Sequence, residues 1–283
     1  MTEVVDAIAA LRDRLSTPRR IGTSIALVPT MGALHRGHAR LIETARAECD
    51  LLVVSIFVNP LQFDRADDLA RYPRTLDADV ATCASSGADI VFAPTAADMY
   101  PHEPAFVVEV RGLGDHLCGR FRPGHFVGVA TVVLKLLHIA QPDRAYFGEK
   151  DAQQLAIIRR MVSDLDVPTT IVGVPTVREP DGLALSSRNR LLSAEERVRA
   201  VALVRLLTEA QRLIAAGTAR ADDVVRQAAA LVPAGPGIRL EYLEIVDPVH
   251  LQPVSDITSP VLVAGAMWVG SVRLIDNVLC RRP

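Results

Sequence analysis

Apolar side chains at the start of the chain recur at helical spacing, and a run that suits a strand follows them. The residues at this spacing are Val4, Val5, Ile8, Leu11 and Leu15. They would share one face of a helix, because positions three or four apart lie on the same side. The β-rich run at residues 24–28 comes next. The N-terminal pattern therefore predicts a helix and then a strand.

Four further apolar runs have the length of strands and alternate with segments of helical character. They lie at residues 51–58, 89–92, 144–147 and 169–174. Because these runs are continuously apolar, each strand should be buried on both faces, as in a parallel sheet. We therefore expect an α/β fold, a Rossmann-like parallel sheet with helices on both faces. Its ligand should bind beyond the carboxyl ends of the strands.

The pattern changes after residue 174, where a long polar, turn-rich stretch suggests a linker or a working loop. Ser193 and Glu196 then form a capping-box signature. Helices are expected near residues 198–213 and 221–231, and three β-like runs follow. These runs lie at residues 240–246, 261–269 and 272–275. The chain should therefore have two domains, a Rossmann-like domain at 1–175 and a smaller α+β domain at 176–283.

Composition and charge exclude several classes of protein. The formal net charge of -2 argues against a protein that grips nucleic acid, which needs a concentrated positive surface. The four cysteines form no CxxC pair, so neither a zinc cage nor a disulfide framework is predicted. The acidic N-terminus is unlike a signal peptide, and no segment approaches the roughly 20 apolar residues of a membrane helix. We expect a cytoplasmic protein.

The first expected strand runs into a loop that contains two histidines and leads into an expected helix. His35 and His38 flank Gly37 in the string VPTMGALHRGH, residues 28–38. Backbone amides and the dipole at a helix N-terminus favour an anion, and imidazoles there can stabilise charge on a phosphate. An isolated pair of this kind is more often a cap or a surface feature. The strand–loop–helix context favours phosphate binding.

Other candidate polar groups follow other expected strands. Asn59 and Gln62 can hold hydroxyl and carboxylate oxygens with neutral amides, although turn formation is the commoner role of such residues. Lys150 suits phosphates and Asp151 a ribose hydroxyl, although a charged run is usually a solvated helix start.

The turn-rich stretch supplies two more hydroxyls and a permanent cation. Ser186, Ser187 and Arg188 lie on an expected loop that could close over a triphosphate and leave with pyrophosphate. By itself such a tripeptide is more often an exposed turn.

These motifs together resemble a known family. The HxGH pattern resembles the signature of the nucleotidyltransferase superfamily, which includes the class I aminoacyl-tRNA synthetases. The fuller string PTMGALHxGH resembles the pantothenate synthetases. Further blocks in the order of that family are SIFVNPLQF at 55–63, YPRT at 72–75, RPGHF at 122–126, YFGEKD at 146–151 with Gln153 and Gln154, VPTVR at 174–178 and SSRN at 186–189. The resemblance covers most of residues 24–190.

The resemblance implies an ATP-dependent acid–amine ligase. The pantoate carboxylate would attack the α-phosphorus of Mg-ATP to give pantoyl adenylate and pyrophosphate, and β-alanine would then displace AMP to give pantothenate. It also implies Mg²⁺ with ATP as co-substrate, a homodimer, and a second domain that acts as a lid. Two other hypotheses stay open, a nucleotidyltransferase that leaves the nucleotide on its product and a catalytically idle nucleotide-binding module.

The resemblance also implies roles for single residues. The catalytic set, with His35 and His38 on the α-phosphate and His38 as a possible proton donor, is His35, His38, Lys150, Ser186, Ser187 and Arg188. The nucleotide would be bound by Thr30, Met31, Gly32, Ala33, Leu34, Gly37, Gly148, Glu149, Asp151, Val177 and Leu185. The substrates would be bound by Gln62, Gln154, Asn59 and Tyr72; among these, Gln62 would contact both pantoate and β-alanine, and Gln154 would contact pantoate. Asp79 is a candidate for assisting magnesium or for ordering the loop.

The chain departs from the family pattern at four positions. Arg36 and Cys118 stand where glutamate is expected, Ala152 replaces an aromatic residue, and Leu185 replaces methionine. Arg36 would add positive charge beside the phosphates. The other departures concern the packing of the adenine pocket and the loop around residue 115.

Overall fold

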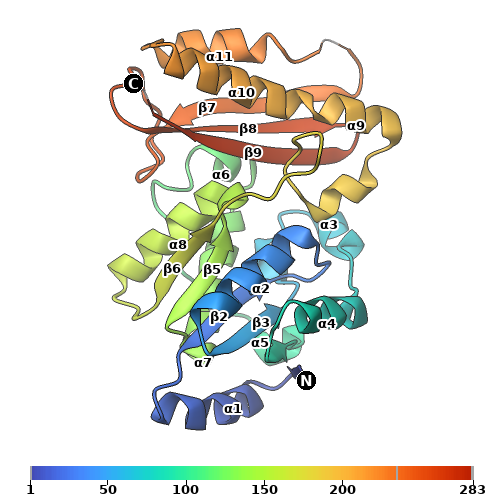
Figure 1. Cartoon of the computed structure of the whole chain (residues 1–283), viewed down its shortest axis with the longest axis vertical. Coiled ribbons are helices and arrows are strands. Elements are labelled where there is room, and N and C mark those ends of the chain that lie inside the picture. Colours follow the sequence, from blue (N-terminus) through green and yellow to red (C-terminus); the bar gives the residue numbers. More distant parts are fainter. Residues whose placement is uncertain (1, 234, 282–283) are drawn as a thin grey trace. The chain divides into compact units, whose positions relative to one another are not determined.

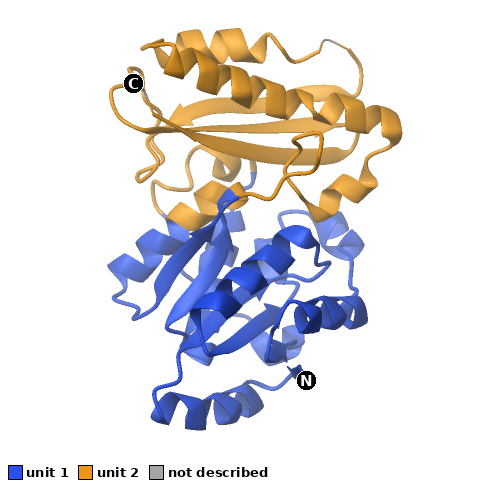
Figure 2. Cartoon of the chain, in the orientation of Figure 1, with its two compact units in different colours: residues 1–110, 122–149, 157–175 blue, residues 111–121, 150–156, 176–283 orange. Residues whose placement is uncertain are grey.

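The structure, a computed structural model, describes residues 2–233 and 235–281, and the chain divides into two compact units (Figures 1 and 2). Unit 1 contains the described residues up to Val110 together with Arg122–Glu149 and Ile157–Pro175. Unit 2 contains Arg111–Phe121, Lys150–Ala156 and the described residues from Thr176 onwards. The predicted domain boundary after residue 175 does not account for the two earlier segments that belong to unit 2.

Unit 1 is built on a six-stranded parallel sheet with the order β1-β4-β3-β2-β5-β6. The strands are β1 (Glu3–Val5), β2 (Ile25–Thr30), β3 (Leu51–Ile56), β4 (Ile90–Phe92), β5 (Arg144–Gly148) and β6 (Thr170–Val174). From β2 the chain adds β3 and β4 on one side, and later places β5 and β6 on the other. The order therefore reverses between β2 and β5, and sheets of this kind bind ligands beyond the carboxyl ends of the strands at that point.

Helices cover the sheet of unit 1. They are α1 (Ile8–Arg20), α2 (Arg36–Glu48), α3 (Ala66–Arg71), α4 (Leu76–Ser85), α5 (Ala96–Met99) and α7 (His125–Ala140), while α8 (Ala152–Asp164) begins in unit 2 and ends in unit 1. Val28 of β2 packs with Ile42 of α2, whereas Leu27 points to the opposite face and is equally buried. The expected Rossmann-like sheet is thus confirmed. In the described part of the chain, no helix has the length and apolar character needed to cross a membrane.

The N-terminal helix is shorter than its apolar spacing predicts. Val4 and Val5 lie in β1, which pairs with β4, and α1 begins only at Ile8. Helical spacing alone cannot distinguish these cases, because two β-branched residues suit a strand when a neighbouring edge offers backbone partners. The prediction that the two valines belong to the first helix is wrong.

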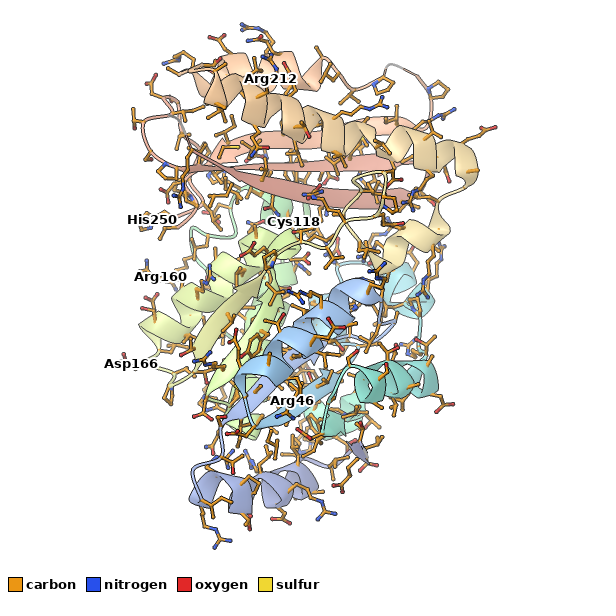
Figure 3. All side chains as sticks on the ribbon, viewed as in Figure 1. Arg46, Cys118, Arg160, Asp166, Arg212 and His250 are labelled. Carbon is orange, nitrogen blue, oxygen red and sulfur yellow. The ribbon has the colours of Figure 1, made fainter. Side chains whose placement is uncertain are left out.

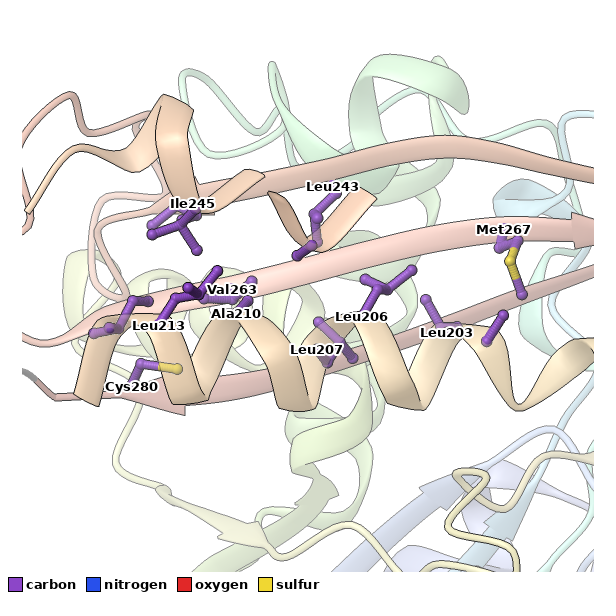
Figure 4. Packing of buried hydrophobic residues seen from close by; sticks show 14 of the residues in the cluster. Leu203, Leu206, Leu207, Ala210, Leu213, Leu243, Ile245, Val263, Met267 and Cys280 are labelled. Carbon is purple, nitrogen blue, oxygen red and sulfur yellow. The ribbon is translucent and has the colours of Figure 1, made fainter. Parts of the chain in front are cut away.

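Unit 2 is a three-stranded antiparallel sheet with a helical layer. The strands are β7 (Ile238–Val246), β8 (Val261–Val269) and β9 (Val272–Cys280), and the helices are α6 (Leu117–Phe121), α9 (Ala194–Ala200), α10 (Ala202–Ala215) and α11 (Ala221–Ala229). One face of the sheet packs against α10, where Leu206 and Leu213 lie in one cluster with Val263 (Figure 4). A second cluster contains other apolar side chains of the same sheet, and Leu117 of α6 and Ala152 of α8 pack with them. The smaller α+β part is confirmed.

Three details of unit 2 show where the sequence pattern was informative and where it was not. The capping box is confirmed, because Ser193 N donates to Glu196 at 2.8 Å and Glu196 N donates to Ser193 Oγ at 3.2 Å. The helix expected at 198–213 is two helices that meet at Val201. Strand β9 continues to Cys280, beyond the expected end at residue 275.

Candidate active site

A buried carboxylate shapes the loop between β2 and α2. Asp79 of α4 is 3% exposed, and its two oxygens accept hydrogen bonds from Ala33 N at 3.0 Å and Leu34 N at 2.7 Å. Gly32 has a φ of 81°, and a Cβ there would lie 2.9 Å from Asp79 Oδ2. Only glycine enters this backbone region without strain, so the glycine and the carboxylate fix the loop together. Of the two expected uses of Asp79, these contacts support loop order.

The same loop is anchored to β3 and to the expected acid-binding glutamine. Thr30 Oγ1 donates to Ser55 O at 2.7 Å and accepts from Gly32 N at 3.2 Å. Met31 Sδ accepts a hydrogen bond from Gln62 Nε2 at 3.1 Å. Expected nucleotide-binding and acid-binding residues therefore lie side by side at the end of β2.

The two histidines cap helix α2 reciprocally. His35 Nδ1 accepts from Gly37 N at 3.1 Å, His38 Nδ1 accepts from His35 N at 3.3 Å, and the ring centroids are 4.1 Å apart. A ring nitrogen that accepts from a backbone N–H carries no proton, so each neutral imidazole carries its proton on Nε2. Capping therefore leaves both histidines with an Nε2–H donor at a helix N-terminus, where an anion is favoured.

Backbone groups fix the orientation of the two neutral amides after β3. Asn59 is 1% exposed; its Oδ1 accepts from Leu61 N at 3.3 Å, and its Nδ2 donates to Gly128 O at 3.1 Å. Those two backbone groups cannot exchange roles, so the amide has only one orientation. Asn59 Nδ2 also donates to Gln62 Oε1 at 3.1 Å, which turns the amide nitrogen of Gln62 away from Asn59. Gln62 is thereby set as a hydrogen-bond donor.

The start of helix α7 and Arg122, which precedes it, hold the backbone carbonyl of the same glutamine. Arg122 Nη2 and His125 Nδ1 lie 3.2 Å and 2.7 Å from Gln62 O. The carbonyl only accepts, so His125 donates through Nδ1. A Cβ on Gly128 would lie 2.2 Å from Leu61 O and 2.6 Å from Gln62 N, so the short helix η1 (Pro60–Gln62) packs directly against the α7 backbone.

Tyr100 and Lys135 complete this network and were not among the sequence candidates. Tyr100 OH donates to Asn59 Oδ1 at 3.0 Å, and burial raises the pKa of Tyr100 to about 12, so the phenol keeps its proton. Lys135 donates to Met99 O and lies 5.2 Å from the centre of the Tyr100 ring. Tyr72, an expected substrate-binding residue, is half-buried, and its ring centroid lies 5.6 Å from that of Phe63 in an edge-on arrangement.

The expected phosphate-binding turn after β5 divides between the units. Gly148 and Glu149 end a segment of unit 1, and Lys150 begins a segment of unit 2. Lys150 Nζ lies 3.9 Å from Asp151 Oδ1, and the Lys150 side chain is 18% exposed.

The two neighbouring glutamines in α8 differ in their surroundings. Gln153 is 6% exposed and its Nε2 donates to Leu113 O at 2.9 Å and His116 O at 2.8 Å, which makes it structural. Gln154, the expected acid ligand, is half-buried.

The Ser-Ser-Arg segment follows a tight hairpin. Leu185 N donates to Val177 O at 3.0 Å, so two expected nucleotide-binding residues pair with each other. Ser186 then caps the short helix η3 (Ser187–Leu191), accepting from Arg188 N at 3.3 Å. All of Ser186, Ser187 and Arg188 are half-buried.

An ion-pair cluster holds this hairpin. Arg197 donates to Glu179 Oε2 at 2.6 Å and to Asp181 Oδ2 at 2.9 Å. These hydrogen bonds lower the pKa of both Glu179 and Asp181 below their ordinary values. Asn189 Nδ2 donates to Glu179 Oε1 at 2.7 Å and to Ala184 O at 3.0 Å.

The four departures from the family pattern lie in different settings. Arg36, at the first position of α2, is exposed. Cys118, labelled in Figure 3, is 8% exposed and lies 3.5 Å from Arg273 Nη1. Ala152 packs against the second cluster of unit 2, and Leu185 is half-buried. Among the described residues, no group of three or more His, Cys, Asp or Glu side chains could hold a metal ion.

A doubly wound parallel sheet with an HxGH cap at the start of α2 is the arrangement expected of the HxGH nucleotidyltransferases. The family model described as pantoate-beta-alanine ligase matches residues 3–279. The chain belongs to the pantoate–β-alanine ligase family. The expected class of enzyme, an ATP-dependent ligase that forms an amide bond, is thereby confirmed.

Individual relatives agree with this membership. The chain is 53% identical to pantothenate synthetase of Rhizobium rhizogenes, over 97% of this chain and 95% of the relative. It is 55% identical to a bifunctional pantoate ligase/cytidylate kinase of Thermosynechococcus vestitus, over 92% of this chain but only 52% of the relative, so it spans about half of that protein.

Solved structures agree as well. Pantothenate synthetase from Thermus thermophilus is 47% identical with a TM-score of 0.92, covering 98% of this chain and 99% of that one. Pantoate-beta-alanine ligase from Francisella tularensis, complexed with beta-gamma ATP and beta-alanine, is 35% identical with a TM-score of 0.82, covering 99% and 98%.

Proposed function

We propose that this chain condenses pantoate with β-alanine to give pantothenate, with ATP converted to AMP and pyrophosphate through a pantoyl-adenylate intermediate. The observation that carries the proposal is the pair of Nε2–H donors that His35 and His38 present at the N-terminus of α2, after a loop whose Met31 contacts Gln62. Family membership and a relative complexed with an ATP analogue and β-alanine support the choice of substrates.

The first step is adenylation. A pantoate carboxylate oxygen forms a bond to the α-phosphorus while the bond from that phosphorus to the bridging oxygen breaks, and pyrophosphate leaves with the electron pair. His35 and His38 donate through Nε2 to the α-phosphate oxygens, where negative charge grows in the transition state. The donors are already oriented by the caps, so little reorganisation is needed during the reaction.

The acid is held by neutral amides. Gln62 presents its Nε2 donors because Asn59 occupies its carbonyl oxygen, and donors suit the carboxylate and hydroxyl oxygens of pantoate. Gln154 and Tyr72 are proposed as further acid ligands. A neutral site binds the acid without holding the carboxylate in a tight ion pair, which would weaken it as a nucleophile.

The nucleotide is held by cations, hydroxyls and the loop backbone. Lys150, Ser186, Ser187 and Arg188 bind the phosphates, and Asp151 binds a ribose hydroxyl. Mg²⁺ enters as part of the Mg-ATP substrate, and Asp79 orders the loop, since both its carboxylate oxygens accept hydrogen bonds from backbone amides.

The second step forms the amide. The unprotonated amine of β-alanine forms a bond to the acyl carbon of pantoyl adenylate, the bond from that carbon to the phosphate oxygen breaks, and AMP leaves with the electron pair. The attacking nitrogen gives up one proton to solvent. Adenylation makes this possible because AMP is a far better leaving group than the carboxylate oxygen.

A pyrophosphate-release assay with ATP and pantoate, with and without β-alanine, tests the proposal. We expect one equivalent of pyrophosphate per enzyme without the amine, and continuous release of pyrophosphate and AMP with it. A nucleotidylated product that accumulates in the presence of β-alanine would identify a nucleotidyltransferase instead. No release with pantoate would refute the proposed substrate.

We also propose that the enzyme works as a homodimer in the cytoplasm. The family resemblance supports a dimer, and the exposed apolar side chain of Phe106, which is 90% exposed in the single chain, offers a surface that a second copy can cover. Light scattering should give twice the chain mass, and a monomer at micromolar concentration would refute the dimer.

A further inference from the structure

Two polar residues interrupt the apolar pattern of β9. Asp276 lies on the same face of the strand as Leu274 and Cys280, which belong to the main apolar cluster of unit 2. Its side chain is only 1% exposed. A buried carboxylate is costly unless it is paired and hydrogen-bonded, so its partners show what its position is used for.

Asp276 anchors the hairpin that leads to the Ser-Ser-Arg segment. Arg178 binds the carboxylate with both terminal nitrogens, at 2.7 Å and 3.1 Å. Arg178 Nη1 also donates to Gly182 O at 3.0 Å, across the hairpin turn. The next residue pair of the hairpin is Val177 and Leu185, directly before Ser186. The planar, two-point ion pair therefore fixes the base of this segment on β9.

Asn277 anchors the turn that carries Lys150. Its Nδ2 donates to Lys150 O at 2.8 Å. The residues after Lys150 are attached to the same sheet, since Ala152 and Ala156 pack in one cluster with Ile275 of β9. These contacts explain why Lys150–Ala156 belongs to unit 2 although the chain enters it from a strand of unit 1.

We propose that Asp276 and Asn277 are positioning residues for ATP, which hold two phosphate-binding elements on one strand. Asp276 places Ser186, Ser187 and Arg188 through Arg178, and Asn277 places Lys150 through its backbone carbonyl. The proposal rests on the proposed function only in taking those four groups as phosphate ligands. Neither positioning residue is itself a ligand of the nucleotide.

The first test is ATP binding to Asn277→Ala, measured by calorimetry with Mg-ATP and no acid. Loss of one neutral hydrogen bond in a half-buried position should leave the protein folded. We expect the dissociation constant for ATP to rise about tenfold, which corresponds to one such bond. The KM for pantoate should change less than twofold. An unchanged ATP affinity in the folded variant would overturn the role of Asn277.

A double-mutant cycle separates positioning from general destabilisation. If Asn277 acts through Lys150, the Asn277→Ala change should have little further effect on ATP affinity in a Lys150→Ala background. Equal losses in both backgrounds would show that Asn277 does not act through the lysine, and would overturn that assignment.

The second arm uses Asp276→Asn, with Glu241→Gln as its matched control. Glu241 is also a buried carboxylate in an ion pair of the same sheet, with Arg273 at 2.5 Å, but it contacts neither phosphate-binding element in the described structure. Both variants should lower the thermal midpoint, whereas only Asp276→Asn should weaken ATP binding, by about tenfold or more. Equal ATP affinities in the two variants would overturn the role of Asp276.

If Asp276→Asn fails to fold, the Asn277 cycle still decides whether β9 positions Lys150. The outcomes are also independent of the proposed reaction. A protein that binds ATP but releases no pyrophosphate with pantoate would refute the function and leave the β9 proposal to be decided by the affinities.

Discussion

Gly128→Ala tests whether α7 sets the position of Gln62, the glutamine proposed to bind the acid. The new Cβ would lie 2.2 Å from Leu61 O and 2.6 Å from Gln62 N, against ordinary contacts of 3.4 Å or more. Backbone cannot rotate away as a side chain can, so η1 and α7 must separate by about 1 Å. Alanine favours a helix over glycine by about 1 kcal/mol, so helix propensity cannot explain a loss.

A displacement of this size should reduce the rate of adenylation. Misplacement of a substrate-holding group by about 1 Å can reduce the rate about 100-fold, equivalent to about 2.7 kcal/mol of transition-state stabilisation. We therefore expect kcat/KM for pantoate to fall about 100-fold in the pyrophosphate-release assay. The affinity for ATP should stay within threefold, because Asp79 and the histidine caps that shape the β2–α2 loop do not involve Gly128.

Gly265→Ala provides the matched control. There the nearest atom to an added Cβ is Leu203 Cδ1 at 3.1 Å, the end of a side chain that can move. This variant should change stability without changing the KM for pantoate. If Gly128→Ala retained kcat/KM within threefold of the wild type, the contact between α7 and η1 would not control Gln62, and this account of acid binding would be refuted.

Three further predictions concern the loop, the cap and the hairpin. Asp79→Asn should lower the adenylation rate more than about tenfold, because one amide of the loop loses its acceptor, while the dependence on Mg²⁺ concentration stays unchanged; a shifted magnesium dependence would instead show a metal ligand. His35→Asn should retain the thermal midpoint, since asparagine is a good N-cap, but should lower single-turnover adenylate formation about 100-fold, and an unimpaired rate would remove the imidazole from catalysis. Because hydrogen bonds from Arg197 lower the pKa of Glu179 and Asp181, their stabilisation is complete at neutral pH and is lost as the pH falls below about 4, through the lowered pKa values. Urea midpoints between pH 3 and 7 should therefore depend less on pH in Arg197→Gln than in the wild type, and parallel curves would contradict this.

Local patterns in the sequence were sufficient for most of the strands. The runs near β2 and β3 are almost continuously apolar, as burial on both faces of a parallel sheet requires, whereas the edge strand β6 is only partly buried. The apolar run that predicts β9 ends at residue 275, because the polar residues Asp276 and Asn277 interrupt it. Their partners lie far away in the sequence, and no local window contains them.

The candidate site was predictable to the extent that each group follows a strand or caps a helix. His35 and His38 had such a context; the structure shows them as a reciprocal cap, the alternative role of such a pair, and their contact with phosphate stays a prediction. The residues that hold Gln62 in place had no such local context. His125 and Gly128 contact Gln62 or its neighbour from more than sixty residues away in the sequence. A glycine inside an otherwise apolar helix was the one available signal, because such a glycine often marks close backbone approach.

The discontinuity of unit 2 has a consequence for biosynthesis. Arg111–Phe121 and Lys150–Ala156 leave the ribosome long before β7, β8 and β9, whose side chains they cover. Unit 2 therefore cannot complete its core until β9 has been synthesised, and a fragment starting at Thr176 would expose Tyr242 and its apolar neighbours to solvent. Nascent chains stalled before β9 should consequently be protease-sensitive at these early segments even when the parallel sheet has already formed.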